Sequence, residues 1–157
     1  MGYFPFYMEI EGKLCVIAGG GKVAYRKVCD LLPFGVRIKV ISLEFNAELG
    51  ALVKDASRTQ GRLQLHRRFF SMDDLKDADF VIAALSDEDL NGQISLYCKE
   101  NKIPVNVVDV KDKCSFIFPA LIQRGPVTVA VSSGGASPVF TRLLKDRIRQ
   151  VLPEETE

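Results

Sequence analysis

Apolar and polar residues follow two different periods along this chain, and the two periods alternate. Continuous apolar runs and two-residue alternation predict strands, and the expected strands are 13–18, 37–42, 63–67, 79–85 and 105–108. Apolar positions three and four residues apart predict helices, and the expected helices are 22–32, 46–56 and 87–101. This order is typical of βαβ units, so it predicts an α/β fold with a Rossmann-like, doubly wound parallel sheet covered on both faces.

The pattern changes after about Asp109, where strand-like runs follow one another without helices between them. These runs are 115–118, 119–122 and 127–131, and a last helix is expected over 137–152. We therefore predict a boundary at about Lys113, with a Rossmann domain over 1–113 and a small α+β segment over 114–157.

Composition narrows the class of protein. The 157 residues contain 21 Lys+Arg and 20 Asp+Glu, and a net charge of +1 argues against a protein that coats nucleic acid. No uncharged run approaches the roughly 20 residues that span a bilayer, and the apolar start lacks the basic residues of a signal peptide. The four cysteines have no CxxC spacing, which indicates buried, reduced thiols in a cytoplasmic protein. His66 is the one histidine, so no metal ligands are predicted.

A glycine-rich turn follows the first predicted strand. Residues 19–24, GGGKVA, fit the pattern G-x-G-x-x-A at a point where a strand passes into a helix. In a dinucleotide-binding fold Gly19 makes the tight turn, Gly21 lets a pyrophosphate approach the backbone, and Ala24 allows close packing of helix on strand. A turn without a ligand is the simpler alternative, but the strand–turn–helix context favours cofactor binding. The candidate cofactor contacts here are Gly19, Gly20, Gly21, Lys22 and Val23.

Further candidates follow the second and fourth predicted strands. Glu44 stands where a carboxylate can bond the adenosine ribose and repel a 2′-phosphate, which favours NAD over NADP. A solvated loop glutamate is the alternative. We expect Asp87 to cap the next helix first and to contact a ligand second, and Ser86 is a candidate cofactor contact.

Asp109 closes the run NVVD over 106–109, at the end of the fifth predicted strand. A carboxylate that emerges there from apolar neighbours is expected to be partly desolvated and suited to general acid–base chemistry. The spacing alone also fits an aspartate that caps or turns the chain.

A second glycine-rich turn, VSSGGASP over 131–138, precedes the last helix. Its glycines expose backbone N–H groups, Ser137 can cap the helix and Pro138 suits the first turn, so the turn predicts an anion-binding helix start. Basic residues gather in this quarter of the chain, at Arg124, Arg142, Lys145, Arg147 and Arg149. They fit a solvated amphipathic helix as well as a surface for a polyanionic small molecule or a partner subunit.

Several motifs together resemble one family. The chain is similar to precorrin-2 dehydrogenase, the NAD-dependent module of siroheme synthase, over about residues 3 to 152. The residues that carry the resemblance are Tyr3-Phe4-Pro5, GGGKVAYRK over 19–27, NVVD over 106–109, CSFIFPA over 114–120 and SSGGASP over 132–138.

This resemblance implies a Rossmann domain followed by a dimerisation segment that interlocks two subunits of a homodimer. It implies NAD-dependent oxidation of precorrin-2 to sirohydrochlorin, and some family members also insert Fe2+ to make siroheme. It further implies adenosine-side contacts at Leu43 and Glu44, and a catalytic role for Asp109. The candidate substrate contacts are Asn106, Arg124, Ser133, Gly134, Gly135, Arg142 and Lys145.

Two features depart from the family. The chain stops at Glu157, so we expect most of the family's helical C-terminal domain to be absent, and PFG over 33–35 stands where Ala-Gly is usual. Two other classes of function stay open. A dinucleotide-sensing regulatory module needs the first glycine-rich turn but not Asp109, and a catalytically silent tetrapyrrole carrier needs neither NAD+ nor turnover.

Overall fold

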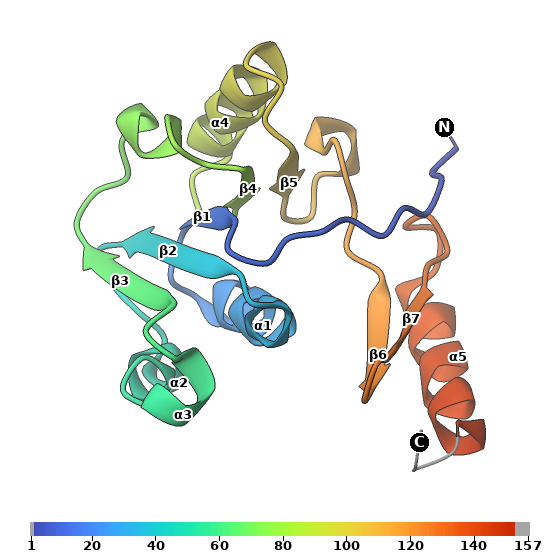
Figure 1. Ribbon diagram of the computed structural model, residues 1–157. Coiled ribbons are helices and arrows are strands. Elements are labelled where there is room, and N and C mark those ends of the chain that lie inside the picture. The colour runs from blue at the N-terminus through green and yellow to red at the C-terminus, as the bar shows by residue number, and fades with distance from the viewer. Residues whose placement is uncertain (1, 153–157) are drawn as a thin grey trace. The chain divides into compact units, whose positions relative to one another are not determined.

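The computed structural model describes residues 2–152, and in it the chain folds into two compact units (Figure 1). The larger unit, Met8–Phe116, is the α/β part. Its strands are β1 Leu14–Ala18, β2 Arg37–Ser42, β3 Leu63–Arg67, β4 Phe80–Ala83 and β5 Val105–Val107. Its α-helices are α1 Lys22–Leu31, α2 Ala47–Leu52, α3 Ala56–Thr59 and α4 Glu88–Glu100, and its 3-10 helices are η1 Leu32–Phe34, η2 Met72–Leu75 and η3 Lys111–Lys113.

The five strands of this unit form one parallel sheet in the order β3-β2-β1-β4-β5. Strand β1 lies at the centre, where Ala18 pairs with Ile41 of β2 on one side and with Ala83 of β4 on the other. The chain winds outward through β2 and β3, then returns to add β4 and β5 on the opposite side. The predicted doubly wound parallel sheet is confirmed, and the reversal places a topological switch point between β1 and β4.

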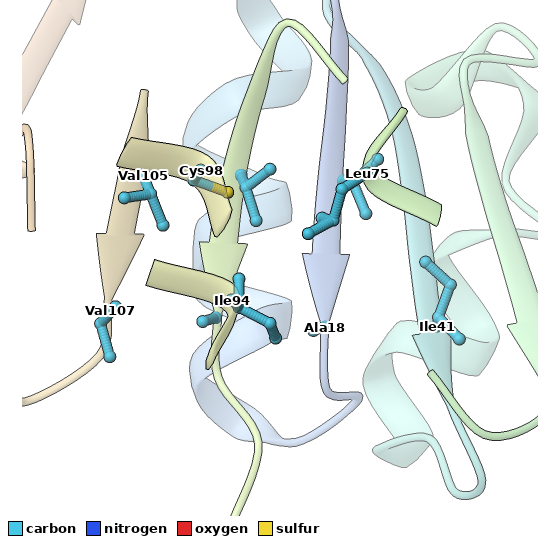
Figure 2. Packing of buried hydrophobic residues seen from close by; sticks show 10 residues of the cluster. Ala18, Ile41, Leu75, Ile94, Cys98, Val105 and Val107 are labelled. Carbon is cyan, nitrogen blue, oxygen red and sulfur yellow. The ribbon is translucent and has the colours of Figure 1, made fainter. Parts of the chain in front are cut away.

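Helix α4 and η2 cover one face of the sheet. Figure 2 shows Ile94 and Cys98 of α4 and Leu75 of η2 against the strands. Each fully buried aliphatic side chain in such a layer contributes roughly 1.5–3 kcal/mol, so this packing holds the strand ends in place. The ten buried residues of the cluster are Val16, Ala18, Ile41, Leu75, Val81, Ala83, Ile94, Cys98, Val105 and Val107.

Helix α1 covers the other face, behind the strands in Figure 2. Because side chains alternate across a strand, Cys15 and Ile17 of β1 point toward this face. Both are fully buried, as are Ala24 and Val28 of α1. The short apolar stripe of α1 is therefore its sheet-facing side, and its first turn lies at the end of β1.

The smaller unit contains the described residues of 1–7 and 117–157. It pairs β6 Ala120–Arg124 with β7 Val127–Val131 in an antiparallel hairpin, followed by α5 Pro138–Val151. The N-terminal segment belongs to it, since the Tyr7 hydroxyl donates a hydrogen bond of 3.1 Å to Thr128 O. Among the described residues of this unit only Ile122 is a buried hydrophobic, and none in α5 is buried.

Two predicted elements differ from the structure. The helix expected over 46–56 is two short helices, because Asp55 interrupts it and caps α3 by accepting hydrogen bonds from Ser57 N and Arg58 N. No strand forms over 115–118, and the first strand after β5 is β6, which begins at Ala120.

The larger unit ends after Phe116, beyond the boundary predicted at about Lys113. Ser115 N donates a hydrogen bond of 2.8 Å to Val105 O, and the Phe116 ring packs edge-on against Phe80 with 6.3 Å between centroids. These contacts tie residues 115 and 116 to the parallel sheet. Within residues 2–152, no helix is both long and apolar enough to cross a membrane.

Candidate functional site

The loops after β2, β1, β4 and β5 all leave the sheet at its carboxyl edge, because the strands are parallel. In that order along the edge they carry Glu44, the turn 19–21, Ser86 and Asp109. Ligands of doubly wound sheets bind at this edge, next to the switch point. The topology therefore brings four predicted site segments to one edge although they are far apart in the chain.

Gly19 and Gly20 are required by close contacts with the neighbouring loops. Gly19 has a φ of +109°, and a Cβ there would lie 2.3 Å from Ala84 O of the loop after β4. A Cβ at Gly20 would lie 2.3 Å from Glu44 O and 2.7 Å from the Phe45 ring, in the loop after β2. The turn is thus packed between two loops of the same sheet edge, with no room for side chains.

Gly21 has the opposite environment. It is exposed, and a Cβ there would have nothing within 4 Å. Gly21 is the N-cap of α1, and no side chain caps this helix, so the first N–H groups, at Lys22 and Val23, lack a side-chain acceptor. An open surface at the positive end of a helix dipole fits the pyrophosphate of a dinucleotide.

Leu43 and Glu44 are exposed in the loop between β2 and α2. Arg67, at the end of β3, holds this loop, although no local sequence motif indicates it. Its Nη1 donates a hydrogen bond of 3.2 Å to Leu43 O, and its guanidinium carbon lies 5.5 Å from the centroid of the Phe45 ring. Only the pairing of β2 with β3 brings Arg67 to the loop, so the sequence pattern missed it.

Ser86 is exposed at the turn between β4 and α4. Asp87 caps α4 by accepting a hydrogen bond of 2.9 Å from Leu90 N, as predicted. The turn is also held by Asn91, a buried residue of α4: Leu85 N donates to Asn91 Oδ1 at 3.2 Å, and Asn91 Nδ2 donates to Leu85 O at 2.9 Å. We did not predict this role of Asn91, although a lone amide on the apolar face of a predicted helix is a signal for it in the sequence.

Asp109 lies in the loop after β5 with a φ of +61°, a left-handed conformation that Asp and Asn adopt more readily than most residues. Its side chain is exposed, so the partial desolvation that we expected is wrong. Both predicted roles fit this geometry, because the residue turns the chain and presents a carboxylate at the sheet edge.

The thiol of Cys114 fastens the loop that carries Asp109. Its Sγ accepts a hydrogen bond of 3.1 Å from Val107 N and lies 3.2 Å from Val107 O and 3.3 Å from Val110 O, to which it can donate. Burial raises the pKa of the Cys114 thiol, so the sulfur keeps the proton that it donates. One side chain therefore joins both sides of the turn around Asp109.

Asn106 is turned inward, and its predicted role as a substrate contact stays a prediction. Its side chain is buried within β5, and Nδ2 donates a hydrogen bond of 3.1 Å to Phe116 O. The amide therefore holds the end of the larger unit against the sheet.

Arg124 has a structural role in the smaller unit, and its predicted substrate contact stays a prediction. Its guanidinium donates hydrogen bonds to Leu152 O and, at 3.0 Å, to Arg149 O. A cation at these carbonyls is favourable because they form the negative end of the α5 dipole.

The second glycine-rich turn is internally hydrogen-bonded. Ser133 Oγ accepts hydrogen bonds of 2.9 Å from Ser137 N and 3.0 Å from Thr141 Oγ1. Gly134 and Gly135 have φ values of +62° and +83°, which L side chains rarely adopt. Ser137 caps α5, as predicted. These hydrogen bonds and glycine conformations fix the backbone of the turn that leads into α5.

Arg142 and Lys145 lie in the first half of α5, in the same unit as this turn. Arg142 is exposed and Lys145 half-buried. A substrate-binding role for the following residues stays a prediction: Ser133, Gly134, Gly135, Arg142 and Lys145.

Within residues 2–152, no group of three or more His, Cys, Asp or Glu side chains could hold a metal ion. His66 is half-buried on β3. Burial, together with the charges of Lys39 and Arg68, lowers its pKa, so the ring is neutral near pH 7.

Two protein families match the chain. Residues 6–120 match the family described as putative NAD(P)-binding, and residues 124–150 match the family described as sirohaem biosynthesis protein central. The chain is 45% identical over 153 residues to a siroheme synthase of Nitrosospira multiformis, which covers 98% of this chain and 32% of that protein. It is 42% identical over 153 residues to a siroheme synthase of Thioalkalivibrio sulfidiphilus, covering 98% and 30%. The chain therefore spans about a third of the length of the curated relatives it matches.

The solved structure of SirC, precorrin-2 dehydrogenase, superimposes with a TM-score of 0.79 at 24% sequence identity, covering 97% of this chain and 72% of that chain. At that identity the likeness concerns the fold, and the predicted Rossmann-like fold is confirmed. The predicted dinucleotide cofactor is confirmed at the level of the family. Because the match over 6–120 includes the whole parallel sheet and its glycine-rich turn, this chain belongs to the family of putative NAD(P)-binding proteins.

Proposed function

We propose that this chain oxidises precorrin-2 to sirohydrochlorin with NAD+. The observation that carries the proposal is that the Gly19–Gly21 turn and Asp109 lie at the same sheet edge, with only β4 between their strands. Two strand spacings are roughly 10 Å, a distance that the nicotinamide half of an extended dinucleotide spans. The siroheme synthase relatives, and the SirC structure through its fold, support the substrate class.

The geometry of the sheet edge supports the proposed cofactor-binding residues. The open start of α1 at Gly21–Val23 suits the pyrophosphate, and Leu43 and Glu44 suit the adenosine. The carboxylate of Glu44 favours NAD+ because it repels a 2′-phosphate. Ser86, at the switch point, lies between these groups and the loop of Asp109. NAD+ bound here would supply the hydride acceptor.

Asp109 is the proposed general base. Oxidation of precorrin-2 by NAD+ removes two electrons and a hydrogen as hydride and releases a proton, which a carboxylate can accept. The exposed side chain of Asp109 can reach a substrate from outside the sheet, while the Cys114 thiol holds the loop that presents it.

The smaller unit is the proposed binding surface for the substrate carboxylates. The cations of Arg142 and Lys145 have the chemistry that a polycarboxylate requires. The Gly134 N–H donates to Ser132 Oγ at 3.0 Å, so within this turn the N–H groups of Ser133 and Gly135 are the ones proposed for the substrate. The net charge of only +1 for the whole chain conceals this local excess of positive charge.

A homodimer formed through the smaller unit is part of the same proposal. Phe140 and Leu143 of α5 are each 56% exposed, and Phe4 and Phe6 are 75% and 79% exposed. A second copy would bury these apolar side chains, which the unit cannot bury itself. Light scattering should give twice the monomer mass.

The dispersed cysteines support a cytoplasmic location for the enzyme.

The test is oxidation of precorrin-2 followed by absorbance, with the unaltered chain and the Asp109→Asn variant. Asparagine also tolerates the left-handed backbone, so the variant removes the charge and keeps the loop. We expect stoichiometric NADH and sirohydrochlorin from the unaltered chain and a turnover at least about 100-fold slower from the variant.

Other outcomes of this assay assign the other functions. Binding of NAD+ without turnover would identify a sensor, and tetrapyrrole binding independent of NAD+ would identify a carrier. Fe2+ is a proposed second substrate, and adding it after oxidation tests for siroheme formation. Equal turnover by the variant would exclude Asp109 as the base.

A further inference from the structure

We propose that Arg67 is a positioning residue for the adenosine half of the dinucleotide. It lies at the end of β3, outside the glycine-rich motif, and acts through the loop 43–45. The inference rests on the dinucleotide-binding part of the proposed function and is independent of the tetrapyrrole.

Arg67 makes two contacts with this loop, one on each side of Glu44. Its Nη1 donates a hydrogen bond of 3.2 Å to Leu43 O, and its guanidinium carbon lies 5.5 Å from the centroid of the Phe45 ring. A planar guanidinium can lie over a ring and donate a hydrogen bond from its edge at the same time, whereas an ammonium group has no plane to stack on the ring. Arg67 therefore fixes the backbone that carries Glu44.

The loop is in turn packed against the phosphate-binding turn. A Cβ at Gly20 would lie only 2.3 Å from Glu44 O and 2.7 Å from the Phe45 ring, so the loop is in direct contact with the turn. A shift of the loop would therefore move the contacts of the adenosine and of the pyrophosphate together. β3 thus takes part in the cofactor site although none of its own residues belongs to the glycine-rich motif.

This arrangement reduces the cost of ordering the loop when the cofactor binds. Leu43, Glu44 and the side chain of Arg67 are all exposed, so the loop is not held by burial at its tip. A loop already fixed in its bound conformation loses less conformational entropy on binding. Loss of Arg67 should weaken dinucleotide binding without removing any contact to the dinucleotide itself.

The test measures binding of NAD+ and of AMP to the full chain by calorimetry. Arg67→Ala should weaken both by up to about tenfold, because a loop released from one hydrogen bond and one exposed cation–π contact must be ordered when the ligand binds. The control is Arg37→Ala: Arg37 is also exposed, and its Nε donates a hydrogen bond of 2.8 Å to Gly12 O at the amino edge of the sheet. Arg37→Ala should bind both ligands like the unaltered chain. Its melting temperature should change by about as much as that of Arg67→Ala.

Two further variants test the route through the loop. Arg67→Lys should recover only part of the affinity, because lysine keeps the charge but not the planar group. Phe45→Leu should weaken binding, and adding it to Arg67→Ala should cost less than the sum of the two single effects, since they share one contact. In turnover, the KM for NAD+ should rise while kcat at saturating NAD+ stays unchanged.

The proposal is overturned if Arg67→Ala binds NAD+ and AMP as Arg37→Ala does, or if Arg67→Lys restores full affinity. Additive effects of the Arg67 and Phe45 substitutions would also overturn it. No NAD+ binding by the folded, unaltered chain would overturn the proposed function as well. Normal binding without oxidation of precorrin-2 would refute only the proposed reaction.

Discussion

The backbone N–H of Asn46 donates a hydrogen bond of 2.8 Å to the carbonyl oxygen of Gly20. The side chain of Asn46 caps α2 at the same time, accepting hydrogen bonds from Glu48 N at 2.9 Å and Leu49 N at 3.3 Å. One residue thus orders both the start of α2 and the phosphate-binding turn.

Gly21→Ala should separate cofactor binding from folding. The added methyl meets nothing in the chain itself but occupies the open surface that suits a pyrophosphate. We expect the free energy of unfolding to fall by at most about 1 kcal/mol, from a poorer helix cap. NAD+ affinity, measured by calorimetry, should fall by about tenfold or more, at least about 1.4 kcal/mol.

Gly20→Ala is the contrasting variant, because its Cβ would lie 2.3 Å from a backbone oxygen. It should lower the free energy of unfolding by about 1–3 kcal/mol, measured by urea denaturation. If Gly21→Ala binds NAD+ normally, the pyrophosphate does not lie at this helix start.

Asn91→Ala should weaken both the fold and the cofactor site. The substitution leaves the N–H and C=O of Leu85 without their partner, which costs about 1–3 kcal/mol in the free energy of unfolding. Because the Leu85 backbone lies against Gly19, NAD+ affinity should also fall. Gln93→Ala, an exposed change on the same helix, is the control in denaturation and binding measurements. Equal melting temperatures for the two variants would refute the role of Asn91.

Asp74 should make the larger unit sensitive to acid. Its buried carboxylate accepts hydrogen bonds from Arg68 and from Lys39 Nζ at 2.8 Å, and these partners, Arg68 foremost, hold the pKa of Asp74 well below its ordinary value. A depressed pKa in the folded state contributes stability above about pH 4, the unfolded value, and loses it as the pH falls further.

The measurement is urea denaturation between pH 7 and acid pH. Asp74→Asn should lower the free energy of unfolding by about 2 kcal/mol at pH 7 and flatten its dependence on pH below about 4. Asp73→Asn, which removes an exposed surface pair with Lys76, should leave the pH profile unchanged. An unaltered acid profile in Asp74→Asn would contradict the prediction.

The thiols should differ in their reaction with iodoacetamide. Burial raises the pKa of Cys15 well above its ordinary value, that of Cys98 to about 11, and that of Cys114 as well, so little reactive thiolate forms near pH 8. Cys29 and Cys114 are both half-buried, but the Cys114 thiol lies within hydrogen-bond distance of Val107 O and Val110 O, so mass spectrometry should find Cys29 modified first. All four should react at similar rates in urea. Modification of Cys15 as fast as Cys29 in the folded protein would contradict this order.

Local patterns were sufficient for the strands and for the caps. All five strands of the parallel sheet were predicted, because continuous apolar runs such as 79–85 and alternating ones such as 37–42 reflect burial on two faces or on one. The caps at Asp87 and Ser137 were predicted for a similar reason, since a cap bonds to backbone only two or three residues away.

Contacts across the fold are what the local patterns left out. The sequence does not show that Asn106 donates to Phe116 O, or that Arg124 donates to carbonyls at the end of α5. Asp109 was expected to be partly desolvated by its apolar neighbours. Its own backbone is left-handed, and its side chain is exposed. Burial of one side chain depends on the whole fold around it.

The sequence by itself determined the class of fold, the position of the glycine-rich turn and the candidate carboxylate at Asp109, because each depends on residues close together in the chain. Only the tertiary structure decided which loops meet at the carboxyl edge, and that Arg67, Asn91 and Cys114 hold them there. Their partners are Leu43, Leu85 and Val107. These three side chains form hydrogen bonds with backbone groups. Because every residue has a backbone C=O and nearly every residue a backbone N–H, the identity of the partner residue gives no signal of the contact in the sequence.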